Sequence, residues 1–291
     1  MKRAGAAGRC RRALVGQIEE AGRELRLRHP SDDSVHAVRK AIKKARAAVR
    51  LMREIYGKVC YRKINATLRD AGRLLAPLRD AKSMADGFRA FHARNAAQLH
   101  GADAAALAAQ LRDRLRAQRR RVSREPATLR ACKSLLAEAR THITGLHLAG
   151  SRAAILKGLR RIYRRGRRAL AAARRAGTPR ALHEWRKQVK YLRNALDILE
   201  AGSSARGARL GKRADKLADA LGEDHELAEL DRHFANLERV AVEARTRRTL
   251  SALIARRRAK LQKRAYALGA KIYAQKPRHF APWLRAIVQD D

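Results

Sequence analysis

Apolar residues recur along this chain with the 3.6-residue period of an α-helix rather than the two-residue period of a strand. Alanine, leucine, arginine, lysine, glutamate and glutamine dominate, whereas β-branched and aromatic residues are sparse. These residue types favour helix, and no segment has the alternating pattern that is typical of a strand. The sequence therefore predicts an all-α protein.

Glycine, proline and serine interrupt this pattern at intervals that suit the helices of a bundle. We place the breaks at residues 29–31, Gly57, Pro77, Gly101, 125–126, 145–151, 177–179, 202–204, Gly222 and Pro277. They divide the chain into roughly ten helices, a number that suits helical bundles. The weakest stretch, residues 145–151, lies almost at the midpoint of the chain and is the expected junction between two halves.

Each half contains one copy of the same basic motif, HxxRKxxKxxR. The first copy consists of His36, Arg39, Lys40, Lys43 and Arg46, and the second of His183, Arg186, Lys187, Lys190 and Arg193. A helix-start signal precedes each copy, at residues 31–34 and 178–179. A leucine-rich segment that turns polar follows each copy, at residues 75–80 and 221–226. This agreement indicates an internal duplication.

The motif spacing places all five side chains on one face of a helix. At about 100° per residue they fall within a sector of about 120° that covers roughly 15 Å of the helix axis. The opposite face is apolar in both copies, with Val38, Ala41, Ala45, Val49 and Met52 in the first, and Trp185, Val189, Leu192, Leu196 and Leu199 in the second. We therefore expect one face to pack into a bundle while the other presents cations.

The charge balance makes a polyanion the expected partner. The chain has 69 lysines and arginines against 27 aspartates and glutamates, a net charge of +42, while its hydrophobic fraction of 46% is enough to build a core. The His36 face carries no carboxylate over three turns, so its like charges disfavour the helix by a few tenths of a kcal/mol per pair. A chain of phosphates would offset this repulsion, because arginine, lysine and histidine all donate to phosphate oxygens.

A basic helix face can also be plain solvated surface, and in an arginine-rich chain this is the commoner outcome for a single copy. Two copies with the same residues at the same offsets, each backed by an apolar face, favour ligand binding instead. Neither motif histidine is expected in the core.

The spacing of the cysteines and the length of the apolar runs indicate the cellular compartment in which the protein is expected. Cys10, Cys60 and Cys132 are widely spaced without a CxxC pair, which fits neither a disulfide framework nor a thiolate zinc site. The basic N-terminus is not followed by an apolar run of signal-peptide length, and no apolar stretch is long enough to span a bilayer. We therefore expect a reducing, cytoplasmic location and no membrane insertion.

The duplicated motif, with a leucine-rich turn into a charged pair after each copy, resembles the CHAD domain, the conserved histidine α-helical domain. The resemblance runs from Arg9 to Ile287 and includes the basic segment 158–168, which is similar to the helix that opens the second half of that family. Two departures concern the turns, with Pro77 where glycine is common in the family and His225-Glu226 where another charged pair is usual.

The resemblance implies a single domain, residues 9–287, made of two pseudo-symmetric helical bundles at 9–147 and 148–287. It also implies that basic surfaces bind long-chain inorganic polyphosphate and target the protein to polyphosphate granules. It assigns phosphate contacts to the ten motif residues, and Lys44 and Arg50 at the margins of the first face are further candidates. A strand-rich CYTH domain, which often accompanies this family, is not seen in the sequence, so a stand-alone protein is expected.

Several alternatives remain open at this stage. Weak, nonspecific nucleic-acid binding or general polyanion binding is the main one, although aromatics make up 4% of the chain and leave few platforms for base stacking. Phosphotransfer on His36 or His183 is the second. Membrane-surface binding by residues 160–175 is weaker, because Leu156, Leu159, Tyr163 and Leu170 suit a bundle core equally well.

We predict no enzymatic activity, no catalytic residue, no metal site and no cofactor, because the motifs lack metal-ligand spacing and the chain lacks a GxxxxGK loop. Asp80, Asp224 and Glu226 are expected to anchor arginines or cap helices. The sequence leaves open the oligomeric state and whether the two basic faces form one groove.

Overall fold

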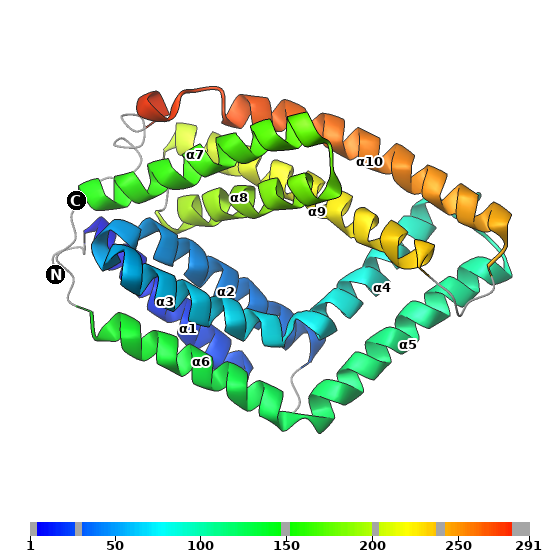
Figure 1. Cartoon of the computed structure of the whole chain (residues 1–291), viewed down its shortest axis with the longest axis horizontal. Coiled ribbons are helices and arrows are strands. Elements are labelled where there is room, and N and C mark those ends of the chain that lie inside the picture. The colour runs from blue at the N-terminus through cyan, green and yellow to red at the C-terminus, as the bar shows by residue number, and fades with distance from the viewer. Residues whose placement is uncertain (1–4, 27–30, 147–151, 200–203, 237–241, 281–291) are drawn as a thin grey trace.

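The structure is a computed structural model that describes residues 5–26, 31–146, 152–199, 204–236 and 242–280 (Figure 1). These residues form ten α-helices and no strand, which confirms the all-α prediction. The helices are α1 (Ala6–Glu24), α2 (Asp32–Leu51), α3 (Arg53–Leu74), α4 (Ala76–Arg94), α5 (Ala102–Arg124), α6 (Pro126–Thr144), α7 (Arg152–Ala176), α8 (Pro179–Ile198), α9 (Ala205–Ala235) and α10 (Ala244–Ile272).

The two motif helices begin where the sequence predicts. Ser31 caps α2, its hydroxyl accepting a hydrogen bond from the Ser34 amide at 3.1 Å. Thr178 caps α8 by accepting from the Ala181 amide at 3.3 Å, and Pro179 occupies the first turn, where its missing N–H costs nothing. Both starts follow the local rules of helix capping.

Some of the predicted helix breaks agree with the structure and one does not. Pro77 lies in the first turn of α4, and Gly57 has a φ of +73° that kinks α3. The break predicted at Gly222 is wrong, because α9 runs through this residue without interruption. The predicted junction at 145–151 falls largely outside the described residues.

Two groups of helices pack against each other in Figure 1. Helices α1, α2, α3 and α6 form one group and α7 to α10 the other, while α4 reaches across to pack on α5 and α9. The ring of Phe88 on α4 meets that of Phe234 on α9 edge-on, with centroids 5.4 Å apart. One hydrophobic cluster contains residues of both groups, and α2 packs directly against α8. The division into halves at residues 147 and 148 stays a prediction.

The apolar face predicted for each motif helix is buried. The residues of α2 on this face are at most 3% exposed, as are those of α8 and its C-cap Leu199. On α7, Leu159, Tyr163 and Leu170 are also buried, which supports the core interpretation of that segment over a membrane-surface one. A search of the described residues for a helix long and apolar enough to cross a membrane found none.

Candidate anion-binding site

The two copies of the motif meet in one groove. A cavity of about 220 Å³ lies between α2 and α8 and is closed by α4 and α9. Its lining residues are His36, Arg39, Lys40, Lys43, Lys44, Arg79, Lys190, Arg193, Asn194, Asp215, Ala218 and Asp219. The structure thus brings together predicted site residues that lie some 150 positions apart in the sequence, and we call this cavity the α2–α8 groove.

Lys43 and Lys190 both line the groove, and both are partly buried. The positive charge of Lys190 acts on Lys43. Burial lowers the pKa of Lys43 to about 7, and Lys190, Arg79, Arg39 and Arg186 lower it further by repulsion. Burial also lowers the pKa of Lys190 to about 8, with Arg186 and Arg79 acting in the same direction. Neither ammonium has a hydrogen bond or ion pair to a carboxylate in the described part of the chain. The groove is therefore short of negative charge.

Arg79 is a groove residue that the sequence prediction missed. It enters from the first turn of α4, where it pairs with the adjacent Asp80 at 3.0 Å. Its charge acts on Lys43 and Lys190 as well as on Arg186. The signal was present, because Arg79 is the first member of the charged pair that ends the leucine-rich segment after the first motif.

Arg39 and Arg186 are equivalent in the motif but differ in their surroundings. Arg39 donates from Nη1 to the Gly72 carbonyl oxygen at 2.5 Å. Nε is unpaired in both arginines, but Arg186, which is 7% exposed, has no hydrogen bond at all among the described residues. A buried guanidinium with an unpaired N–H is costly unless an anion reaches it. Burial and the neighbouring Arg79 accordingly lower the pKa of Arg186.

Gly222 on α9 lies against the guanidinium of Arg186. A β-carbon placed at this glycine would lie 3.8 Å from both Nε and Nη2 of Arg186. A larger side chain at the same position of α9 would enter the volume that the guanidinium occupies. The glycine that resembles a helix break in the sequence is thus a packing position in a continuous helix.

Five predicted site residues lie outside the lining of the groove: Arg46, Arg50, His183, Arg186 and Lys187. Lys187 pairs with Glu184 on the same helix and is 44% exposed. Arg46 and Arg50 donate to Oδ1 of Asn65 on α3, at 3.2 and 2.9 Å. The guanidinium of Arg50 also lies 3.7 Å from the centre of the Tyr191 ring, which joins α2 to α8 through a cation–π contact. Their phosphate contacts stay predictions.

The two motif histidines also differ. His36 is exposed and lines the groove, and burial together with Lys43 lowers its pKa. His183 is half-buried, with its ring centroid 4.1 Å from that of His225 on α9. Burial lowers the pKa of His183 as well, and it lowers that of His225 to about 3. Both rings are therefore neutral at neutral pH.

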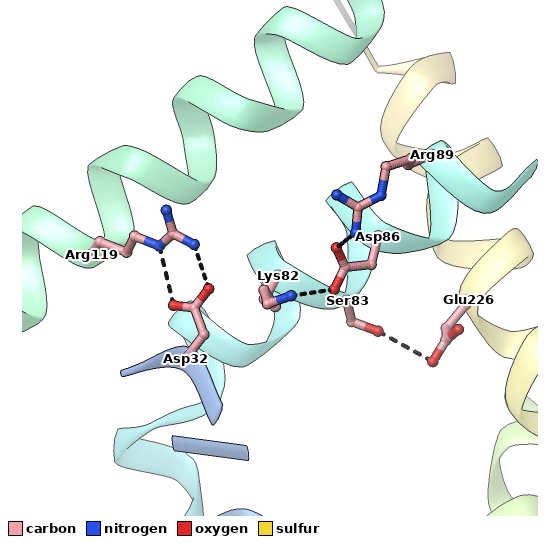
Figure 2. Close-up of polar contacts among 7 residues, drawn as sticks. All are labelled: Asp32, Lys82, Ser83, Asp86, Arg89, Arg119 and Glu226. Carbon is pink, nitrogen blue, oxygen red and sulfur yellow. Dashed lines mark hydrogen bonds and ion pairs between the residues drawn. The ribbon is translucent and has the colours of Figure 1, made fainter. Parts of the chain in front are cut away.

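Beyond His36 and Arg79, a second cavity of about 450 Å³ adjoins the groove and carries mixed charge. Figure 2 shows the cationic partners of two of its carboxylates, Asp32 and Asp86. Asp32 receives two hydrogen bonds from Arg119, at 3.1 and 2.6 Å, and Asp86 binds Lys82 and Arg89, each at 2.6 Å. The uncompensated positive charge therefore lies in the groove itself.

The remaining carboxylates of the two charged turns have structural partners. Glu226 accepts a hydrogen bond from Ser83 at 3.2 Å (Figure 2). Asp224 is 2% exposed and accepts from Arg258 at 3.1 Å and Gln262 at 2.8 Å. Among the described residues, no group of three or more histidines, cysteines, aspartates and glutamates is placed to hold a metal ion.

These features define an all-helical protein in which two copies of one basic helix meet in a cationic groove. The family model of the CHAD domain matches residues 9–235, and the chain belongs to this family. No curated protein sequence matches the chain.

Two solved structures share the fold. The CHAD domain from the plant Ricinus communis superposes with a TM-score of 0.66 and 20% identity, covering 94% of this chain and 93% of that one. PptA from Streptomyces chartreusis superposes with a TM-score of 0.61 and 16% identity, covering 94% of this chain and all of that one. At these identities the comparison establishes the fold, and the chemistry depends on this chain's own residues.

Proposed function

We propose that this protein binds long-chain inorganic polyphosphate in the α2–α8 groove and that it acts as a binding protein without catalytic activity. The phosphate contacts come from Arg39, Lys40, Lys43, Lys190 and Arg193 in the groove, with His36 and Lys44 at its margins and Arg186 beneath it. Binding in the cytoplasm at polyphosphate granules, as the family resemblance implies, is part of this proposal.

The observation that carries the proposal is the placement of Lys43 and Lys190. Two partly buried ammonium groups from different helices share one cavity without a carboxylate partner. Such an arrangement repels itself until an anion enters, and phosphate oxygens supply the missing acceptors. The repulsion in the free protein and the attraction in the complex together favour a multiply charged ligand.

The groove favours a slender chain of phosphates over a duplex. A cavity of about 220 Å³ between helices has room for a few phosphate groups but not for paired bases. A flexible chain can occupy the groove and continue over the surrounding basic surface, so affinity should rise with chain length and fall with salt.

Competition binding near physiological salt tests this function. Long-chain polyphosphate, duplex DNA and heparin, at matched charge, compete for the wild type, for K40Q/K43Q/K190Q and for the control R112Q/R120Q/R124Q. The three control arginines are exposed on α5, outside the groove, so both variants lose the same charge.

The expected result is preference for polyphosphate, lost in the groove variant and kept in the control. Equal affinity of the wild type for all three polyanions would make the protein a general polyanion binder, and equal losses in both variants would overturn the site.

A further inference from the structure

A second basic surface lies on the outer side of α7. This helix contains nine arginines and one lysine but no aspartate or glutamate. Arg160, Arg164, Arg168 and Arg175 are all exposed, and we call these four residues the α7 ridge. In the described part of the chain they have no hydrogen bond or ion pair. No carboxylate of the described residues is paired with them.

Several other surface arginines have carboxylate partners. On α5, Arg119 pairs with Asp32 and Arg121 with Glu125. On α10, Arg257 pairs with Glu223 and Arg258 with Asp224. On α7 itself, Arg161 pairs with Glu54, but it lies to the side of the ridge. The four ridge arginines have no such carboxylate partner among the described residues.

The ridge is a straight line of charge on a convex surface. At about 100° per residue, its four side chains fall within about 80° of one another and opposite the buried face that contains Ile155, Leu159 and Ile162. From Arg160 to Arg175 the line extends about 22 Å along the helix axis. A flexible chain of phosphates can lie along such a line and contact every arginine in turn.

The ridge and the α2–α8 groove lie on different sides of the molecule. No residue that lines the groove belongs to α7. Helix α8 separates the two, because Trp185 packs beside Leu170 of α7 at Gly269, while Lys190 lies about 140° further round α8 and faces the groove. A polyanion held in the groove therefore leaves the ridge free for another.

We propose that the α7 ridge binds a second polyphosphate chain, so that one protein molecule bridges two chains. This inference rests on the proposed function, because the groove must hold the first chain. The residues along the ridge favour this ligand over two others. Ala153 and Ala171 are the exposed apolar residues on this face, so it lacks the large side chains that anchor a helix in a membrane. It also lacks the asparagine or glutamine that reads base edges and the aromatics that stack on bases.

A two-chain capture experiment tests the bridge. Polyphosphate on beads first binds the protein, and a second, fluorescent polyphosphate chain is then added after washing. The ridge variant is R160Q/R164Q/R168Q/R175Q. The matched control is R112Q/R120Q/R124Q/R130Q, which removes four exposed arginines from α5 and α6. Circular dichroism confirms that both variants are folded.

The wild type and the control should capture the fluorescent chain, whereas the ridge variant should bind the beads and capture about tenfold less. Capture by the ridge variant equal to that of the wild type would overturn the inference, as would an equal loss in the control. Preferential capture of fluorescent duplex DNA or of anionic vesicles would assign the ridge to another partner. If the wild type does not bind the beads at all, the proposed function has failed rather than the bridge.

Discussion

The first copy of the basic motif keeps its cations accessible, whereas the second buries or neutralises several of its own. On α2, His36 and Lys40 are exposed, and Arg39 donates to a backbone carbonyl. On α8, the ring of His183 contacts that of His225 at a tilt, and Lys187 pairs with Glu184. Arg193 donates to Asp215 at 2.5 Å, so the second copy also has a carboxylate partner in the groove.

Arg79 and His225, which hold equivalent positions in the charged turns after the two motifs, show the same contrast. Arg79 comes four positions after Leu75, and His225 comes four positions after Leu221. The first is a permanent cation at the groove, while the second is a neutral imidazole at neutral pH because its pKa is lowered to about 3. Identical spacing therefore fixes which face of a helix a residue occupies, while the neighbouring helices decide its charge and exposure.

The largest effect is expected when the groove lysines of both copies, Lys43 and Lys190, are changed together. Reversing both groove lysines in K43E/K190E should lower the affinity for long polyphosphate by about a thousandfold, because two charge-assisted contacts become repulsive. Isothermal titration calorimetry measures this loss. The K187E variant serves as a control, since Lys187 lies outside the groove lining and should cost far less. Equal losses in the two variants would contradict the assignment.

A second effect depends on pH. Above pH 7 the free protein loses protons from Lys43 and then from Lys190, whose pKa values are about 7 and 8, whereas a bound polyanion keeps both lysines charged. Binding therefore takes up protons, and affinity should be highest below pH 7 and fall by about 500-fold between pH 7 and 9. The groups that face these lysines are Arg39 on α2, Arg79 on α4, Arg186 on α8, and Asp219 and Glu226 on α9.

The conservative variant K43R/K190R sharpens this prediction. Arginine stays charged across the same pH range, so the affinity of the variant should change less with pH than that of the wild type. Binding assays at a series of pH values, with salt held constant, compare the two proteins. A slope that is the same in both would show that the proton uptake arises elsewhere.

A third and smaller effect tests the buried arginine of the second copy. G222L should displace Arg186 and weaken polyphosphate binding by about fivefold. G222A should leave binding unchanged, because its β-carbon makes an ordinary contact, and should stabilise α9 by about 0.5–1 kcal/mol. Thermal denaturation measures the second result. If G222L bound as tightly as G222A, Arg186 would have no part in the site.

The smallest effect compares two lysines at the same motif position. K40Q should weaken binding by about threefold, because Lys40 is exposed in the groove lining, while K187Q should have almost no effect. Affinities for one chain length at one salt concentration are sufficient for this test. A larger loss in K187Q than in K40Q would reverse our ranking of the copies.

The sequence was sufficient to predict the helices and the basic faces because both depend on residues close together in the chain. Ser31 and Thr178 cap their helices through neighbours three residues away. Helical geometry alone places the five motif residues on one face. The meeting of the two faces could not be predicted in this way. It depends on how α2 packs against α8, and no periodic pattern within either helix encodes that contact.

Arg79 and Gly222 illustrate what sequence patterns miss. Arg79 reaches the groove because α4 starts beside α2, so its role depends on a turn in the chain rather than on its own helix face. Gly222 is a helix breaker by composition, yet α9 runs through it without interruption, with Leu221 and Asp224 beside it buried. Local propensity is a weak guide wherever a neighbouring helix determines the outcome.

The direct packing of α2 on α8 also bears on how such a site could arise. A binding site that lies between two copies of one motif is the site that a twofold-symmetric dimer of a single copy would form. Joining the copies in one chain frees each from that symmetry, so that Arg79 and His225, or Gly72 beside Arg39 and Gly222 beside Arg186, can diverge. The two halves of the groove thus differ in ways that a symmetric dimer would not permit.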